Sequence, residues 1–420
     1  MTFTWSSQDD QVIKYSRALA ADAVQKVGNG HPGTAMSLAP VAYLLFQKHL
    51  VHDPKDPKWI GRDRFVLSCG HSSLTLYTQL FLSGYGLEMK DLQSFRTWDS
   101  LTPGHPEYGH TAGVEMTTGP LGAGISTAVG MAMAQRFEKG LLDPESSLFD
   151  HRVYVLCSDG DLQEGVSSEA SSLAGTQELG NLIVIYDDNR ISIEGDTHIA
   201  FTENVSARYA AYGWHVEEVA AQSDGSVDIQ ALDAAIERAK SETTKPSLIR
   251  LHTVIAWPAP KSRGTAKSHG SALGDEEVAA TKVELGLNPD EKFAMPADLL
   301  AHARHVVERG ARAHAEWNAE LAKWRSAKPE KAALLDRLLA KKLPDLKVPE
   351  FPQDKEMATR AASGKVINAL AEQLPELWGG SSDLAESNNT SIENGGSFLP
   401  ATSQMKGANP YGRIIHFGIR

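Results

Sequence analysis

The first hydrophobic pattern along the chain is that of an amphipathic helix. Ser6 or Ser7, followed by Asp9 and Asp10, is typical of a helix start, because serine caps free N–H groups and acids complement the helix dipole. Apolar residues then recur at helical spacing, at Val12, Leu19, Ala23, Val24 and Val27. The following Gly28-Asn29-Gly30 predicts where the helix ends.

Short apolar runs that end in polar residues follow, and they predict strands. The runs cover residues 64–68, 153–157, 182–186, 215–219 and 248–255. Helical patterns lie between them, as in residues 164–179 and 229–240. Strands that alternate with helices and are continuously apolar predict an α/β fold, a parallel sheet with helices on both faces. In such sheets, ligands bind at the carboxyl ends of the strands.

The pattern changes twice toward the end of the chain. After about residue 286 it becomes helical and rich in Ala, Lys, Glu and Leu, with Trp317 and Trp324 as expected packing anchors. Pro344, Pro349 and Pro352 then predict an extended linker. The expected organisation is a first domain over 1–340, a linker over 341–355 and a partial second α/β domain over 356–420. At about 150 residues per domain, a chain of 420 residues is expected to contain two or three domains.

Composition excludes several classes of protein. Lys and Arg number 41 against 53 Asp and Glu, a net charge of −12, which argues against nucleic-acid and membrane binding. Only two cysteines occur, Cys69 and Cys157, both inside apolar runs, so neither a disulfide framework nor a zinc motif is expected. The N-terminal residues from Met1 show no basic or apolar leader pattern. We therefore expect a cytoplasmic protein.

Two strand ends carry the strongest local signal for chemistry. Asp159-Gly160 follows one predicted strand, and Asn189 follows the next. If these strands are neighbours, a carboxylate, an amide oxygen and a loop carbonyl can converge on Mg²⁺ or Ca²⁺, and Gly160 lets a phosphate approach the backbone. Asp and Asn also serve as plain turn formers at strand ends. These residues alone leave both interpretations open.

Four histidines lie in turns bounded by small residues or proline, namely His31, His71, His105 and His269. A single histidine of this kind is usually a surface or turn residue. Four in similar settings favour a polar pocket presented by loops. The glycine-rich segment 117–124 opens a helix of small residues and can cradle a ligand, although such glycines also serve close helix–strand packing.

Taken together, the motifs resemble the transketolase family of thiamine-diphosphate enzymes nearly end to end. The segments that carry the resemblance are Gly30-His31-Pro32-Gly33, residues 62–68 with Gly70-His71, residues 102–107, 117–122, Asp159-Gly160 with Glu164-Gly165, Tyr186-Asp187-Asp188-Asn189, Ser268-His269-Gly270, Ala358-Thr359-Arg360, and residues 380–384 with Ser387-Asn388. So many ordered matches make the resemblance specific.

The resemblance implies thiamine diphosphate as the cofactor, with Mg²⁺, or Ca²⁺, Mn²⁺ or Co²⁺ in its place. It implies that the ion is held by Asp159, Asn189 and the carbonyl of Ile191. The cofactor positions that it implies are His71, Gly119, Pro120, Leu121, Gly160, Asn189, His269 and Asp383.

The reaction implied by the resemblance is transfer of a two-carbon ketol unit from a ketose phosphate to an aldose phosphate. In the pentose phosphate pathway, this step converts sedoheptulose 7-phosphate and glyceraldehyde 3-phosphate into ribose 5-phosphate and xylulose 5-phosphate, and the reverse. It implies that His31, His105 and His269 bind the sugar and transfer protons, and that Arg360 and Ser387 bind the substrate phosphate. Glu164 and Glu169 resemble a carboxylate chain at a homodimer interface, and without the family match they read as solvated helix charges.

Some positions depart from the family pattern. Ser158 replaces a glycine before the metal aspartate, and Ala123 replaces a glutamine. These changes bear on affinity and substrate preference. Two alternatives stay open: a dihydroxyacetone synthase-like ketol transferase, and a cofactor-binding fragment without catalysis. The second arises because the family's catalytic glutamate is expected just beyond Arg420, so we expect this chain alone to be inactive.

Overall fold

A computed structural model describes residues 3–420, so Met1 and Thr2, where the leader pattern was sought, lie outside the described residues. The chain divides into two compact units. One holds the chain up to Gly130 together with His151–Glu316, and the other holds Met131–Asp150 with Trp317–Arg420. The domain boundaries expected from the sequence, with a linker over 341–355, stay a prediction. Residues 343–352 contain neither helix nor strand.

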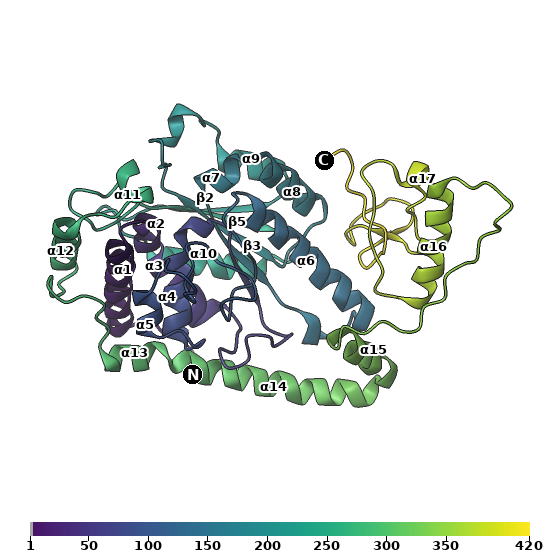
Figure 1. Cartoon of the computed structure of the whole chain (residues 1–420), viewed down its shortest axis with the longest axis horizontal. Coiled ribbons are helices and arrows are strands. Elements are labelled where there is room, and N and C mark those ends of the chain that lie inside the picture. The colour runs from purple at the N-terminus through teal and green to yellow at the C-terminus, as the bar shows by residue number, and fades with distance from the viewer. Residues whose placement is uncertain (1–2) are drawn as a thin grey trace. The chain divides into compact units, whose positions relative to one another are not determined.

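The first unit is built on a five-stranded parallel sheet (Figure 1). Its strands run in the order β1-β2-β3-β5-β4, and every pair of neighbours is parallel. The bounds are β1 Arg64–Leu67, β2 Val153–Ser158, β3 Leu182–Asp188, β4 His215–Val219 and β5 Ser247–His252. All five predicted strands are confirmed, although the last ends three residues before the apolar run does.

Helices cover both faces of this sheet, as predicted. Every residue of β2 and β3 is buried. Because alternate side chains of a strand point to opposite faces, both faces must be covered. The helices that share the buried core with these strands include α1 Ser7–Val27, α2 Pro32–Ser37, α3 Ala39–Leu44, α4 Ser73–Ser83 and α10 Ile229–Ser241. Helix α9 Val205–Ala211 contacts β4 and β5, and α8 Gly165–Thr176 packs against α7 Asp159–Gln163.

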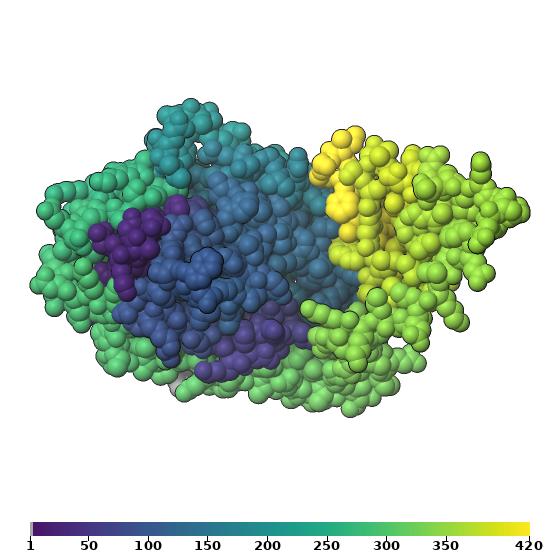
Figure 2. Space-filling model, viewed as in Figure 1, coloured from purple at the N-terminus to yellow at the C-terminus, as the bar shows by residue number. Residues whose placement is uncertain are grey.

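Further elements complete the description up to Ala327. They are the single-turn helices η1 Leu45–His49, η2 Gly70–Ser72, η3 Ser147–Phe149 and η4 Thr197–Ile199, and the α-helices α5 Met89–Gln93, α6 Ala123–Leu142, α7 Asp159–Gln163, α11 Ala266–Gly270, α12 Asp275–Glu284, α13 Ala297–Ala303 and α14 His305–Ala327. Helix α1 packs beside α12 and α13, and the purple N-terminal segment is visible next to green in Figure 2.

The predicted first helix is confirmed at both ends. Ser6 and Asp9 form a capping box, in which the Asp9 carboxylate accepts the backbone N–H of Ser6 at 2.7 Å. Gly28 ends the helix with a left-handed φ of 78°, which glycine adopts without steric cost. Asp9 also accepts hydrogen bonds from Tyr43 and His302, so one buried carboxylate joins α1 to two other helices.

Asp161 is the buried carboxylate that joins the strand ends. It lies in α7 directly after β2 and is fully buried. One oxygen accepts the Ser68 hydroxyl at 2.7 Å and the Gly122 N–H at 2.9 Å, and the other accepts the Ser158 N–H at 3.0 Å. The Ser68 hydroxyl oxygen in turn accepts the N–H of Ile125 at 3.0 Å. One side chain therefore positions the ends of β1 and β2 and the glycine-rich segment 117–124.

The second unit packs around aromatic residues. Trp324 is buried, donates to Asp143 at 2.9 Å and contacts Phe149 edge-on. Trp317 donates to the carbonyl of Leu148 at 2.9 Å, so both predicted packing anchors are confirmed. The remaining elements are α15 Pro329–Leu339, α16 Thr359–Gln373, α17 Ala385–Asn388, β6 Ser397–Phe398 and β7 Ala408–Asn409.

The cysteines and the hydrophobic character of the helices can now be described. Cys69 and Cys157 are free thiols, both buried. Within residues 3–420, no helix has the length and apolar character needed to cross a bilayer.

Loss of the Asp161 carboxylate should destabilise the first unit. In Asp161→Ala, the N–H groups of Gly122 and Ser158 and the Ser68 hydroxyl lose a buried acceptor. We expect the free energy of unfolding to fall by about 2–4 kcal/mol. Chemical denaturation measures it, and Asp290→Ala, at an exposed position, is the control with a change below about 0.5 kcal/mol. Equal effects of the two substitutions would contradict this role.

Candidate active site

The four histidines picked out from the sequence form one cluster. The ring centre of His31 lies 5.2 Å from that of His71, 5.6 Å from that of His269 and 6.3 Å from that of His105. His71 and His269 stack at 4.9 Å. They come from four separate segments, since His31 precedes α2, His71 lies in η2 after β1, His105 in a loop and His269 in α11. The expected polar pocket of histidines is therefore present.

Burial keeps these imidazoles neutral. It lowers the pKa of His31 to about 4, with the nearby His269, Arg96 and His105 adding to the effect. Burial also lowers the pKa of His71, His105 and His269. A neutral imidazole carries one N–H donor and one lone pair, so the cluster can both give and take hydrogen bonds or protons.

Several polar atoms of this cluster have no partner within the described part of the chain. They are Nδ1 of His31, Nε2 of His71, Nδ1 of His269 and Oγ1 of Thr118, all buried. Buried polar atoms are normally hydrogen-bonded, and each one left without a partner costs about 1–3 kcal/mol. Four such atoms at one place indicate a site shaped for a polar ligand.

Glycines bring the surrounding backbone close to the cluster. A side-chain carbon on Gly70 would lie 2.6 Å from Thr118 Oγ1 and 2.7 Å from Gly119 N, and one on Gly160 would lie 2.9 Å from Leu121. Gly119 has a φ of 149° and faces His105. The predicted cofactor positions Gly119, Leu121 and Gly160 are thus brought together beside His71 and His105.

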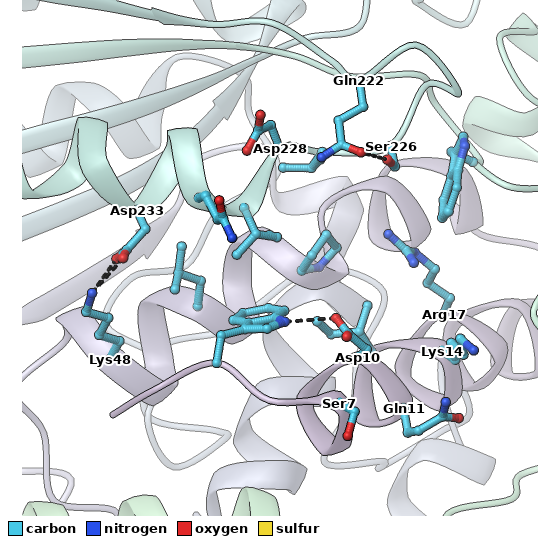
Figure 3. Close-up of a pocket in the computed structure, with 18 of the residues that line it drawn as sticks. Ser7, Asp10, Gln11, Lys14, Arg17, Lys48, Gln222, Ser226, Asp228 and Asp233 are labelled. Atoms are coloured by element: carbon cyan, nitrogen blue, oxygen red, sulfur yellow. Dashed lines mark hydrogen bonds and ion pairs between the residues drawn. The ribbon is translucent and has the colours of Figure 1, made fainter. Parts of the chain in front are cut away.

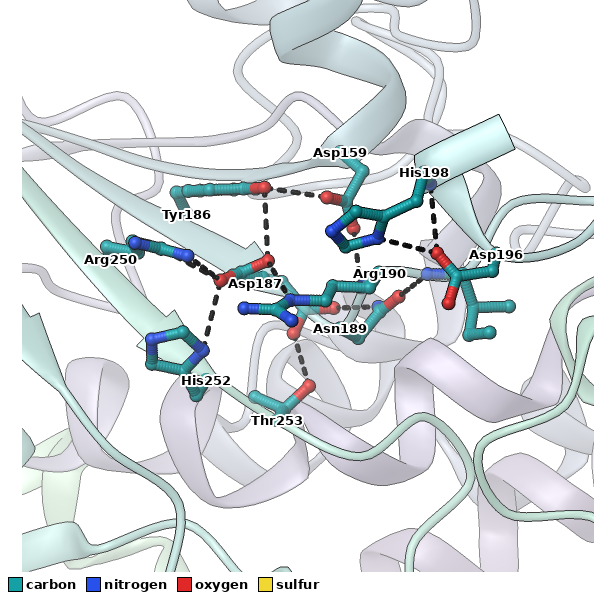
Figure 4. Close-up of polar contacts among 12 residues, drawn as sticks. Asp159, Tyr186, Asp187, Asn189, Arg190, Asp196, His198, Arg250, His252 and Thr253 are labelled. Carbon is teal, nitrogen blue, oxygen red and sulfur yellow. Dashed lines mark hydrogen bonds and ion pairs between the residues drawn. The ribbon is translucent and has the colours of Figure 1, made fainter. Parts of the chain in front are cut away.

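Acidic residues occupy the neighbouring strand ends (Figure 4). Ser158 of β2 is paired with Asp187 of β3, so the carboxyl ends of the two strands are adjacent. The Asp159 carboxylate accepts the Tyr186 hydroxyl at 2.6 Å and the Arg190 N–H at 3.1 Å. Asn189 donates to Asp187 at 2.7 Å. The sequence expectation that Asp159 and Asn189 share one sheet edge is met.

Burial makes these carboxylates costly to ionise. It raises the pKa of Asp159 to about 6, and the negative charge of Asp188 adds to the rise. It raises the pKa of Asp187 to about 7, where Asp159 and Asp188 again add to the rise. Asp188 itself is paired with Arg250 at 2.8 Å and with His252 at 3.0 Å. A divalent cation would relieve the remaining repulsion.

The donors at this edge fit such a cation. Asp159 and Asn189 offer carboxylate and amide oxygens, and the carbonyl of Ile191 accepts no hydrogen bond from residues 3–420. Oxygen ligands of this kind suit Mg²⁺ and Ca²⁺. Asn189 Oδ1 currently accepts the Ile191 N–H at 2.9 Å, which fixes the loop that carries both groups.

The remaining predicted site residues are exposed. Glu164 directly precedes α8 and lies close to Gly122 of the glycine-rich segment, and Glu169 lies within that helix. Pro120 is exposed in the glycine-rich segment. Arg360, Asp383 and Ser387 belong to the second unit and are all exposed, and Asp383 has a left-handed φ of 53°.

Sequence reasoning gave no role to Asp187, Thr118 and Asp161. Asp187 accepts hydrogen bonds from Thr253 and Asn189 and is fully buried. The available signal was an acidic pair directly after an apolar strand. For Asp161 the available signal was its capping-box spacing from Ser158. Thr118 carries no such signal, because its importance depends on which segments the fold brings to it.

Comparison with known proteins gives a consistent match. The family profile described as "Transketolase, thiamine diphosphate binding domain" matches residues 8–344. The chain is 57% identical to a transketolase of Mycobacterium leprae, over 99% of this chain and 60% of that protein. It is 46% identical to a transketolase of Geobacillus stearothermophilus, over 99% of this chain and 61% of that protein. The chain thus spans about 60% of the length of the curated relatives that it matches.

Solved structures agree with this match. A crystal structure of a Pichia stipitis transketolase in complex with sedoheptulose-7-phosphate is similar, with a TM-score of 0.94 and 44% identity over 99% of this chain and 61% of that one. A transketolase structure from Campylobacter jejuni has a TM-score of 0.89 and 43% identity over 99% of this chain and 62% of that one. The predicted fold class is confirmed by both.

A side chain at Gly70 should disturb the glycine-rich segment. In Gly70→Ala the new carbon would press on Thr118 and Gly119, so we expect the free energy of unfolding to fall by about 1–3 kcal/mol. Thiamine-diphosphate affinity, measured by calorimetry, should fall with it. Gly165→Ala is the matched control, because no atom lies within 4 Å of its new carbon and its φ is unstrained. A Gly70 variant as stable as the control would contradict the close approach.

Metal affinity should depend on pH through Asp159. Since its folded pKa is raised to about 6, a divalent cation must displace a proton below that pH, and its affinity should fall about tenfold per pH unit there. In the metal-free chain, the stability contribution of the protonated group is present below the unfolded pKa and lost as pH rises through about 6.

Asp159→Asn should therefore weaken both effects, with metal affinity at pH 7.5 at least about tenfold lower. It should also stabilise the metal-free chain at that pH, because one buried charge is removed from beside Asp187 and Asp188. Mg²⁺ titration and thermal unfolding from pH 5 to pH 8 measure the two. A pH dependence as steep in this variant as in the parent would contradict the assignment, because only the part due to Asp187 should remain. Asp290→Asn serves as the control.

Proposed function

Because the chain belongs to the transketolase family, we propose that it supplies the thiamine-diphosphate site of an enzyme that transfers two-carbon ketol units between sugar phosphates. The observation that carries the proposal is the cluster of four neutral histidines with unpartnered buried nitrogens, beside an acidic strand edge. A phosphate-bearing, metal-dependent ligand matches both halves of that site.

The cofactor would be held by residues from the first unit. His71, Gly160 and Asn189 would contact the diphosphate, and the segment Gly119-Pro120-Leu121 would lie along the aminopyrimidine. Asp159, Asn189 and the Ile191 carbonyl would bind Mg²⁺, or Ca²⁺, Mn²⁺ or Co²⁺. Support comes from the unpartnered His71 Nε2, the close approach of Leu121 to Gly160, which leaves no room for a side chain there, and the raised pKa of Asp159. When bound, thiamine diphosphate supplies the electron sink that C–C cleavage needs.

The histidines would orient the sugar and move protons. His31, His105 and His269 are neutral at pH 7, so each can accept a proton from a substrate hydroxyl or bind it as a donor. The free Nδ1 atoms of His31 and His269 are available for that contact. Their burial limits access of water, which would otherwise hydrate the reacting groups.

Other roles in this proposal rest on residues at the surface. Arg360 and Ser387 would bind the substrate phosphate through a guanidinium and a hydroxyl, and Asp383 would contact the cofactor. Glu164 and Glu169, exposed on the first unit, would line a homodimer interface. Sugar phosphates are the proposed substrates, in the pentose phosphate pathway of the cytoplasm. A sugar phosphate is bound in the similar Pichia stipitis structure.

Calorimetric titration of the chain with thiamine diphosphate and Mg²⁺ tests the cofactor site. We expect binding that requires the metal, and an affinity at least about tenfold lower in His71→Ala, because the ligand loses a buried hydrogen-bond partner. His305→Ala, at an exposed position of α14, should bind as the parent does. Binding that is equal without metal, or unchanged in His71→Ala, would contradict the proposed site.

The holoenzyme containing this chain tests the reaction. Ketol transfer from xylulose 5-phosphate to ribose 5-phosphate should fall about 10²–10⁴-fold in kcat when His31, His105 or His269 is replaced by glutamine. Cofactor affinity should change far less in His31→Gln and His105→Gln. Faster turnover with formaldehyde than with ribose 5-phosphate would overturn the sugar-phosphate acceptor in favour of a dihydroxyacetone synthase-like activity.

A further inference from the structure

A second cavity lies in the first unit, lined by residues that the proposed function does not use (Figure 3). Its volume is about 930 Å³. One wall is a face of α1 that carries Asp10, Ile13, Lys14 and Arg17, which recur at helical spacing. The facing wall comes from the loop around Ser226 and the start of α10. Pockets that bind small organic ligands have volumes of about 300–1,000 Å³.

The most unusual group in this cavity is the guanidinium of Arg17. Arg17 is only 7% exposed, and its Nε donates to the Met36 carbonyl at 3.1 Å. The guanidinium carbon lies 4.5 Å from the ring centre of Trp257. It makes no other hydrogen bond within residues 3–420, so four of its N–H donors lack a protein acceptor. A buried cation in this state normally has an anionic partner.

The carboxylates nearby do not provide that partner. Asp10 accepts the Trp5 indole N–H at 2.8 Å, and Asp233 is bound by Lys48 at 2.6 Å. Neither forms a hydrogen bond with Arg17. Burial lowers the pKa of Arg17 to about 9, while Asp224 and Asp10 attract its charge from a distance, so the group is still cationic at pH 7.

A second cation lies one turn earlier on the same face. Lys14 lines the cavity and forms no ion pair with the described residues. Asp228 is occupied as the cap of α10, where it accepts the Ala231 N–H at 2.9 Å. Of the lining carboxylates, only the exposed Glu284 is without a partner in the described chain. The end of the cavity at Arg17 and Lys14 is thus free to bind an acid group.

The other part of the lining is apolar. Trp5, Ile13 and Leu44 lie on one side, and Val227 and Ile229 on the other. Ile13, Leu44 and Val227 are nearly buried by the protein itself. A flat ring can exclude water from such a surface, with Trp5 available for an aromatic contact.

We propose that this cavity is a second ligand site, which takes a small planar organic anion, an aromatic carboxylate or phosphate ester. Its acid group binds the Arg17 guanidinium and Lys14, and its ring packs against Trp5, Leu44 and Ile229. A planar guanidinium with free donors matches carboxylate and phosphate oxygens in pairs. This site is separate in sequence and in lining from the histidine cluster.

A matched pair of probes tests the proposal. The chain, saturated with thiamine diphosphate and Mg²⁺, is titrated with 1-naphthoate and with neutral 1-naphthamide, and binding is followed by calorimetry and ligand-observed NMR. We expect naphthoate to bind at least tenfold more tightly than naphthamide. Arg17→Lys keeps the positive charge but loses the planar guanidinium that can bind two oxygens at once. It should lower the affinity for naphthoate at least fivefold.

Lys14→Gln keeps the test decisive if Arg17→Lys does not fold, because Lys14 is only half-buried and has no ion pair to lose. It should weaken naphthoate at least threefold and leave naphthamide unchanged. Arg312→Lys and Lys355→Gln, at exposed positions, are the matched controls. Equal binding of the two probes, no effect of either cavity variant, or displacement of naphthoate by xylulose 5-phosphate would overturn the proposal.

Discussion

The site depends on one buried carboxylate, that of Asp161. It holds Ser68 after β1, Ser158 at the end of β2 and Gly122 in the glycine-rich segment through four direct hydrogen bonds. Its desolvation raises its own pKa, and the donors around it work against that rise. Because η2 with His71 begins two residues after Ser68, the same carboxylate indirectly positions the histidine cluster. Ser158, where the resemblance predicts a glycine, belongs to this network.

The site contains two kinds of group that lack a partner among the described residues: buried histidine nitrogens without a hydrogen bond, and buried carboxylates without a neutralising cation. Its histidines are neutral and three of them present free nitrogens. Burial raises the pKa of Asp159 to about 6 and that of Asp187 to about 7, with repulsion from Asp188 adding to both and repulsion from Asp159 adding to that of Asp187. A bound cation would favour both carboxylates in their charged form, and neutral imidazoles would bind polar groups without opposing it. The hydrogen-bonding and charge requirements of these groups are thus met better with a ligand than without one. This is expected of a binding site whose groups are fixed in position before the ligand binds.

Sequence patterns predicted the sheet well because continuous apolar strands need only their own residues to be recognised. They also predicted that His31, His71, His105 and His269 lie together, through their shared turn contexts. Thr118 and the long-range role of Asp161 escaped notice. The spacing of Asp161 from Ser158 indicates a local capping box, but nothing local shows that a polar residue will be buried among distant partners. The segment 131–150 belongs to the second unit, which no local pattern indicates. Long-range packing decides such features, and periodicity does not report it.

The burial of Arg17 is a further feature that the sequence pattern does not indicate. On a helical stripe it reads as a solvated charge, yet the fold places it against Trp257 and the Met36 carbonyl. Both contacts lead toward the histidine cluster, because Met36 lies in the helix that follows His31 and the N–H of Ala256, next to Trp257, donates to the Gly33 carbonyl at 3.0 Å. A methionine or leucine would fill this space at less desolvation cost. The anion site proposed above would give this buried cation a partner that its contacts within the described chain do not supply.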